Sequence, residues 1–146
     1  MASMKMVQTA QLKDAEIYQG AETCKQKSKE ILEEMKLPNG LLPLSDMVEF
    51  GFNRSTGYFW VKQKKSTQHR FQKVGKTLSY DAEVAAFVEE GRMKRITGVK
   101  SKELLIWVSL SDLFIDDPSS DKISFGTSAG ISRPFPFSAF VSQDAD

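Results

Sequence analysis

One stretch of the chain matches a motif that can carry a catalytic nucleophile. Residues 126–130 read GTSAG and satisfy G-x-S-x-G, in which a serine at a strand-to-helix turn attacks an ester or amide carbonyl. A helix must follow that serine, but Pro134 and Pro136 stand where the helix would run. His69 also precedes Ser128, the reverse of the order that this class of hydrolase uses. The pattern therefore favours a hairpin loop, and an esterase with Ser128 beside His69 is the less favoured alternative.

The sequence also contains no complete motif for binding a metal or a cofactor. His69 and Cys24, the single residues of their types, lack the spacing of a zinc site, and the aspartates between 112 and 121 lack that of a calcium loop. Gly75-Lys76-Thr77 resembles the end of a P-loop, but arginine stands at position 70, where the first glycine belongs. We therefore expect no metal and no cofactor. Cys24 fits a small core residue better than a reactive thiol.

Charge gives a stronger indication of a binding surface. The chain has 20 Lys and Arg against 19 Asp and Glu, and this balance makes nucleic acid an unfavoured partner. Residues 62–102 nevertheless hold eleven cations against four acids, whereas residues 103–146 hold two against seven. Paired strands from these two segments would cancel much of the field. The basic residues form either a solvated hairpin that protects a sheet edge or an anion site. They are Lys62, Lys64, Lys65, Arg70, Lys73 and Lys76.

Hydrophobic periodicity predicts the first half of the fold. Residues 21–36 place Cys24, Ser28, Ile31 and Met35 on one stripe, which predicts an amphipathic helix that ends before Pro38. From residue 47 the period becomes two, and 47–53 with 58–63 predicts a hairpin. Further strands are expected at 69–74, at 77–89, where a short helix over 81–90 is the alternative, and at 92–97.

The second half is dominated by the run ELLIWVSLSDLFIDD over residues 103–117. It is apolar on both faces when read with a period of two, which is typical of a strand buried inside a sheet. A final hairpin is expected over 122–133. The pattern predicts a mainly β (α+β) fold: one N-terminal helix packed on a curled antiparallel sheet, barrel-like or sandwich-like. Residues 1–20 are expected to be a flexible tail, 21–140 a single domain, and 141–146 a C-terminal tail.

The cellular location of the protein is predicted from its N-terminal residues, its apolar stretches and its cysteine content. The start, MASMKMVQTAQ, has no apolar leader, and no stretch approaches the roughly eighteen apolar residues of a membrane span. One cysteine permits no intrachain disulfide, which fits a reducing compartment. We therefore expect a soluble, cytoplasmic protein.

Several segments together resemble a known family. They are LPNGLLP at 37–43, GFNRSTGYFWVKQKK at 51–65, GRMKRITGVKSKELLIWVSLSDLFIDDP at 91–118 and SRPFPFSAF at 132–140. The order closely resembles the plant family called domain of unknown function 538, from about residue 15 to 140. The resemblance implies one helix on a long curled sheet, similar to half of a bactericidal/permeability-increasing protein. It also implies links to stress responses and to lipid or pigment binding, with no agreed catalytic residues to carry over.

Two functions follow as hypotheses. The first is a non-enzymatic binder of an apolar or amphipathic ligand, which requires that the many aromatic side chains leave a cavity rather than pack solidly. The second is a protein-interaction or scaffold domain that has no small ligand, with a partner that the sequence does not identify. For the first, the expected ligand lining is Val48, Phe50, Phe52, Trp60 and Ile106, and the expected head-group site is Lys62, Lys64, Lys65 and Arg70.

Overall fold

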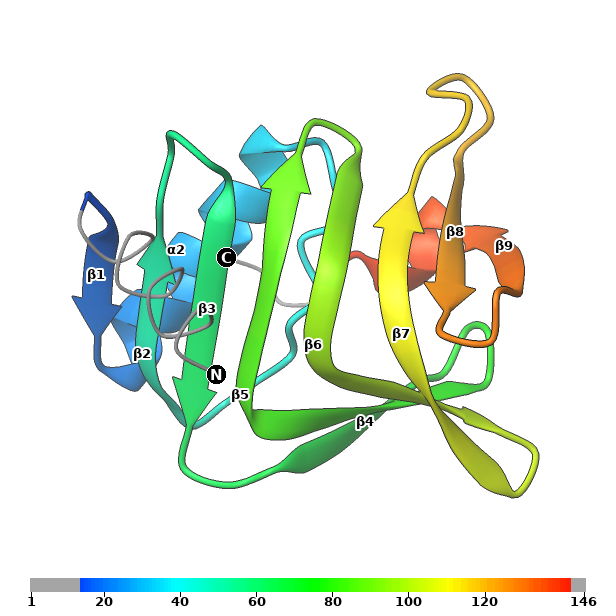
Figure 1. Cartoon of the computed structure of the whole chain (residues 1–146), viewed down its shortest axis with the longest axis horizontal. Coiled ribbons are helices and arrows are strands. Elements are labelled where there is room, and N and C mark those ends of the chain that lie inside the picture. The colour runs from blue at the N-terminus through cyan, green and yellow to red at the C-terminus, as the bar shows by residue number, and fades with distance from the viewer. Residues whose placement is uncertain (1–13, 143–146) are drawn as a thin grey trace.

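A computed structural model describes residues 14–142. One helix lies on one face of a nine-stranded antiparallel sheet (Figure 1). The sheet has the order β1-β2-β3-β5-β6-β7-β8-β9, and β4 pairs with β5 off this path. The elements are β1 (Glu16–Gln19), α2 (Ala21–Glu34), β2 (Met47–Phe52), β3 (Tyr58–Gln63), β4 (Thr67–Phe71), β5 (Lys76–Glu89), β6 (Arg92–Glu103), β7 (Ile106–Phe114), β8 (Lys122–Thr127), β9 (Ser132–Pro136) and the 3₁₀ turn η1 (Phe137–Phe140).

The predicted fold class is confirmed, with the sheet open rather than closed into a barrel. Strands β1 and β9 are the two ends of the main strand order and do not pair with each other, and β4 is a further edge strand because it pairs with β5 alone. Pro134 and Pro136 stand on the β9 edge, where a missing backbone N–H costs no ladder hydrogen bond.

The helix follows its sequence pattern. Cys24, Ser28, Ile31 and Leu32 are buried against the sheet, where β1 and β2 lie beneath the helix. It ends at Glu34, because Lys36 takes a left-handed backbone (φ 60°) and the Leu37 N–H bonds back to the Leu32 carbonyl at 2.9 Å. This six-to-one bond satisfies a carbonyl that the last turn would otherwise leave unpaired.

The predicted N-terminal tail is partly wrong. Residues 1–13 lie outside the described residues, but Glu16–Gln19 forms strand β1 and pairs with β2. Arg54, in the β2–β3 turn, binds the carboxylates of Glu16 on β1 and Glu34 on α2. The first strand, the helix and the first hairpin are therefore tied together by one guanidinium group.

The sheet bends through its long central strands. Residues 76–89 form one strand, as the favoured interpretation predicted, but β6 runs to Glu103 instead of stopping at Thr97. Gly98 does not end β6. Its positive φ (86°) lies at a register shift between β5 and β6, and the strand continues beyond it. A Cβ at Gly98 would lie 2.3 Å from the Glu83 carbonyl oxygen, so no other residue fits this bend. The first part of β5 pairs with β4, and its last part pairs with β3.

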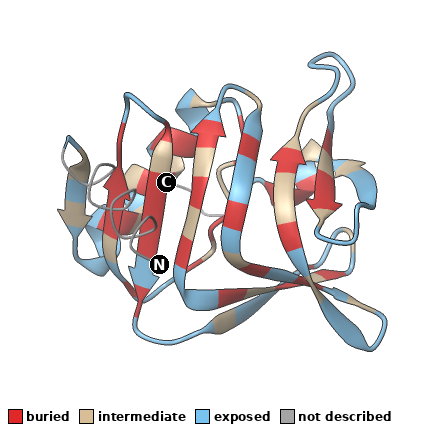
Figure 2. Cartoon of the chain, viewed as in Figure 1, coloured by how far each residue is buried: buried red, intermediate tan, exposed pale blue. Residues whose placement is uncertain are grey.

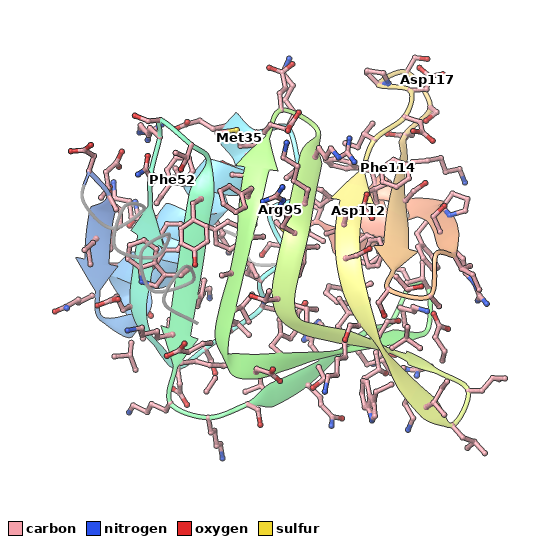
Figure 3. The ribbon with its side chains drawn as sticks, viewed as in Figure 1. Met35, Phe52, Arg95, Asp112, Phe114 and Asp117 are labelled. Carbon is pink, nitrogen blue, oxygen red and sulfur yellow. The ribbon has the colours of Figure 1, made fainter. Side chains whose placement is uncertain are left out.

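Burial alternates along the strands (Figure 2), and the core combines buried side chains of the sheet with those of α2, of the segment 37–44 and of η1. The basic strand β6 pairs with the more acidic β7, as the charge pattern suggested. Arg92 Nη2 on β6 lies 3.6 Å from Oδ2 of Asp112, which Figure 3 labels on β7. Beside it, Arg95 has a left-handed backbone, and its guanidinium covers the Phe87 ring at 5.9 Å.

The prediction of a strand buried on both faces over 103–117 is wrong. Leu110 and Leu113 on β7 are buried, but Leu104 and Leu105 are each 94% exposed at the turn between β6 and β7. The hairpin extends past the body of the sheet at the lower right of Figure 1, where no layer covers it. Residues 103–117 therefore form a strand with one buried face, which contains Leu110 and Leu113, and an exposed apolar turn at Leu104 and Leu105.

Candidate ligand-binding groove

The residues expected to line a ligand cavity are not gathered in one place. Phe50 and Phe52 are 1% and 0% exposed in the core, and neither lines any of the three pockets described below. Val48 is exposed because a bulge between Met47 and Glu49 turns it away from the face that Phe50 uses. Trp60 is buried and donates its indole N–H to Glu49 at 2.7 Å, and Ile106 is exposed near the hairpin tip.

The expected head-group residues are also dispersed. Lys64 and Lys65 are exposed in the β3–β4 turn, and Arg70 lies on β4. Lys62 shares a pocket of about 430 Å³ with Trp60, so the structure brings these two predicted residues together. Asp81 and Glu83 also line that pocket, and their carboxylates oppose the binding of an anion there.

A different site is built around Arg70. It is a groove of about 670 Å³ between α2, the segment 39–45, the end of β4 with its following turn, and the segment 139–142. Its apolar lining residues are Leu42, Pro43, Leu44, Phe71, Ala139 and Val141. A volume of this size lies within the range of small-molecule sites, roughly 300–1,000 Å³.

The charged side chains of the groove all have one sign. Lys25 and Lys29 come from α2, Arg70 from β4 and Lys73 from the turn after it, with His69 beside them. No Asp or Glu occurs in the described lining. Within residues 14–142, Arg70 and Lys73 form no salt bridge with a carboxylate. Arg70 and Lys73 therefore give their side of the groove positive charge, which attracts anions.

Close backbone contacts hold the walls of the groove. The Gly40 N–H donates to the Phe140 carbonyl at 2.9 Å, and the Ser142 N–H donates to Asn39 Oδ1 at 2.7 Å. The Phe140 ring meets Phe71 edge to face at a centroid distance of 4.9 Å. These contacts hold three parts of the groove together: the segment 39–45, the C-terminal segment 139–142 and β4.

A smaller pocket, of about 220 Å³, lies near the tip of the β6–β7 hairpin. Its lining includes Ile106, Val108 and Ile131, together with the ion pair between Lys76 and Glu103, whose atoms are 2.6 Å apart. Arg133 approaches the same carboxylate at 3.9 Å. The apolar walls and the paired charges make this pocket less attractive to an anion than the groove.

The motif residues occupy ordinary structural positions. Ser128 lies in the connection between β8 and β9, so the predicted hairpin is present, but its loop spans 128–131 because Gly126 and Thr127 belong to β8. The Ser128 N–H donates to the Ser109 carbonyl at 2.9 Å. His69 lies on β4 with its ring edge-on to Phe71 at 4.6 Å. Across residues 14–142 no hydrogen bond joins Ser128 to His69. The predicted esterase pair is therefore not assembled by a hydrogen bond.

Cys24 has the environment of a core residue. Its side chain is fully buried, and its thiol donates to the Tyr18 carbonyl at 3.4 Å. Burial raises the pKa of the Cys24 thiol, which keeps it in the less nucleophilic protonated form. The interpretation of Cys24 as a packing residue is confirmed.

Sequence reasoning missed most of the groove. Arg70 and Lys73 belong to the predicted basic cluster, but Lys25 and Lys29 lie on the helix and belong to none of the predicted sites. Their spacing of four residues places them on one helix face, which was the available signal. Nothing in the sequence indicated that the segment 39–45 would fold against the end of β4. In the part of the chain that the structure describes, no three metal-ligating side chains cluster together, and no helix is long and apolar enough to cross a membrane.

The fold and the groove define a class of protein: a single helix packed on an open, bent antiparallel sheet, with a basic groove beside the helix. The chain belongs to the family described as "Protein of unknown function, DUF538", which matches residues 28–141. The matched region contains the described groove except for Lys25 and Ser142. No curated protein and no solved structure matches the chain.

Proposed function

We propose that this protein is a non-enzymatic binder of an anionic amphipathic small molecule, such as a fatty acid or a lysophospholipid, and that the basic groove is its binding site. The observation that carries the proposal is that Arg70 and Lys73, which form no salt bridge with a carboxylate of residues 14–142, lie in a groove that is also lined by apolar side chains. The apolar chain of the ligand packs against the apolar lining residues, and its anionic head group binds near the cationic side chains.

The lining of the groove holds groups that suit both parts of such a ligand. Leu42, Pro43 and Leu44 supply apolar lining, and each methylene that a ligand buries contributes about 0.8 kcal/mol. Arg70 and Lys73 belong to the same lining and supply positive charge. An arginine favours carboxylate and phosphate groups because its planar fork donates two parallel hydrogen bonds.

The proposal is tested by titrating the full chain with a fluorescent fatty acid and, separately, with its uncharged methyl ester. We expect saturable binding of the acid at micromolar concentration and weaker binding of the ester. Charge reversal in the variants Arg70→Glu and Lys73→Glu should each weaken binding of the acid roughly tenfold, the equivalent of about 1.4 kcal/mol.

Matched controls come from the neighbouring turn. Lys64 and Lys65 are exposed and lie outside the described groove lining, so Lys64→Glu and Lys65→Glu change the net charge equally without altering the site. If these controls weaken binding as much as Arg70→Glu, the effect is long-range and the groove is not the site. Absence of saturable binding sets the proposal aside in favour of an interaction domain without a small ligand. A plant origin, a role in stress and a cytoplasmic location stay predictions of the sequence.

A further inference from the structure

The tip of the β6–β7 hairpin exposes four apolar side chains in a row. Leu104 and Leu105 are each 94% exposed, Ile106 is 63% exposed and Trp107 is 38% exposed. Figure 2 shows this tip as an exposed projection at the lower right of the sheet. Single exposed apolar residues are ordinary, but four consecutive ones at the most prominent point of a hairpin mark an interaction site.

The backbone at the tip favours this interpretation. Glu103 pairs with Ile106, so Leu104 and Leu105 form a two-residue turn. Leu104 has a left-handed backbone with φ 56°, a conformation that such turns normally assign to glycine or asparagine. The turn therefore places a leucine where a small or polar residue would fold more easily. Neither leucine contributes to the core, so its side chain has no folding role that offsets this strain.

Cations lie directly behind the apolar tip. Lys100 and Lys102 on β6 are exposed, and the Lys102 ammonium lies 5.8 Å from the centre of the Trp107 ring. Glu103, the carboxylate within this hairpin end, is already bound by Lys76 at 2.6 Å and approached by Arg133 at 3.9 Å. The free charge of the hairpin end is therefore positive.

From these observations we propose that the hairpin tip docks the protein on an anionic lipid bilayer. Leu104 and Leu105 enter the outer hydrocarbon, Trp107 lies at the level of the interface, and Lys100 and Lys102 contact acidic head groups. This order along the hairpin matches the order of a bilayer leaflet, in which aromatic rings prefer the interface and lysines contact acidic head groups. The tip uses other residues than the basic groove, so the proposal does not depend on the ligand proposed for that groove.

The shape of the tip favours a membrane over a protein partner. A stable protein interface buries about 800 Å² on each side, which a two-residue turn at the end of a ribbon cannot supply. A bilayer surrounds an inserted tip on all sides and needs no complementary surface. A second copy of the chain or another protein is the competing occupant, and the measurements below distinguish them.

The test is flotation of the full chain with vesicles of phosphatidylcholine alone and with vesicles enriched in phosphatidylserine. We expect binding to the phosphatidylserine vesicles that falls as salt is raised. The double variant Leu104→Asp with Leu105→Asp should lose at least tenfold in vesicle partition. The matched control is Ile17→Asp, because Ile17 is an exposed apolar residue on the distant edge strand β1 and is 48% exposed. Circular dichroism checks that both variants remain folded.

A second measurement reports on the tip itself. Trp60 and Trp107 are the two tryptophans, so the Trp60→Phe variant leaves Trp107 as the fluorophore. Its emission should shift to the blue when phosphatidylserine vesicles are added, and brominated lipid should quench it. The proposal is overturned if wild-type protein does not float at low salt, if Ile17→Asp loses as much binding as the double variant, or if the tip proves to mediate a dimer in sedimentation.

Discussion

The Lys76 ammonium lies 2.6 Å from a carboxylate oxygen of Glu103, and so joins the first residue of β5 to the last residue of β6. The Lys76 side chain is 9% exposed and that of Glu103 is 25% exposed, so water screens the pair only in part. Lys76 also lies 5.6 Å from the centre of the Phe135 ring. The pair anchors the β6–β7 hairpin at the residue directly before its tip, Leu104 and Leu105.

Breaking this pair should destabilise the fold. Lys76→Met leaves the Glu103 carboxylate with the more distant Arg133 alone, and we expect a loss of about 1–3 kcal/mol in the free energy of unfolding, less than for a fully buried pair. Urea denaturation measures this loss. The double variant Lys76→Met with Glu103→Gln should recover part of it, because no unpaired charge then remains. A double variant as unstable as the sum of the two single variants would contradict a coupled pair.

A second prediction concerns Tyr80, which ties the sheet to the segment beneath the groove. Its hydroxyl donates to the Leu41 carbonyl at 2.8 Å, and its side chain is buried in β5. Tyr80→Phe keeps the ring and leaves that carbonyl without its partner, so we expect a loss of about 1–2 kcal/mol in the free energy of unfolding. Thermal denaturation provides the measurement, and Tyr58→Phe, at a half-buried tyrosine, is the control.

The same hydroxyl predicts how stability depends on alkaline pH. Burial raises the pKa of Tyr80 well above its ordinary value of about 10, so the folded protein keeps a proton that the unfolded chain releases. The stability linked to Tyr80 is therefore fully present below about pH 10 and is lost as the pH rises beyond that value. Denaturation midpoints should fall more steeply above pH 10 for the wild type than for Tyr80→Phe. Equal slopes would show that Tyr80 is not the group responsible.

Local sequence patterns correctly predicted the elements in which buried side chains recur at a regular period. The helix stripe from Cys24 to Ile31 and the alternation of Phe50 with Phe52 both reappear as buried faces, because period alone decides which side chains point inward. Val48 was expected on the buried face of β2 but is exposed, because a bulge shifts the register of the strand at this point. The alternation of apolar and polar residues gives no sign of such a bulge.

The hairpin tip was mispredicted for a related reason. Leu104 and Leu105 form a turn without any glycine, proline or asparagine, so the run of apolar residues concealed the boundary between two strands. The groove was not predictable from any single stretch. Lys29, Leu42 and Arg70 come from a helix, a loop and a strand that meet only through long-range packing, and no periodicity links them.

Gly40 supplies the last prediction, which links stability to the groove. A Cβ at this position would lie 2.5 Å from the Phe140 carbonyl oxygen and 2.9 Å from the Ser142 nitrogen, both of them backbone atoms. Gly40→Ala must therefore push the C-terminal segment away and lengthen the bond from the Gly40 N–H to Phe140. We expect a loss of about 1–3 kcal/mol in stability, typical of overpacking. Because both segments line the groove, binding of the fluorescent fatty acid should weaken as well.

The control for Gly40→Ala is Ser45→Ala, which removes a hydroxyl from an exposed position in the same groove without adding an atom. It should leave the free energy of unfolding within about 0.5 kcal/mol of the wild-type value, as expected for a surface substitution. If Gly40→Ala lowers stability while fatty-acid binding stays at the wild-type level, the contact between Gly40 and Phe140 holds the fold but does not shape the ligand site. If it changes neither, the packing of these two segments is looser than the 2.9 Å hydrogen bond between them implies.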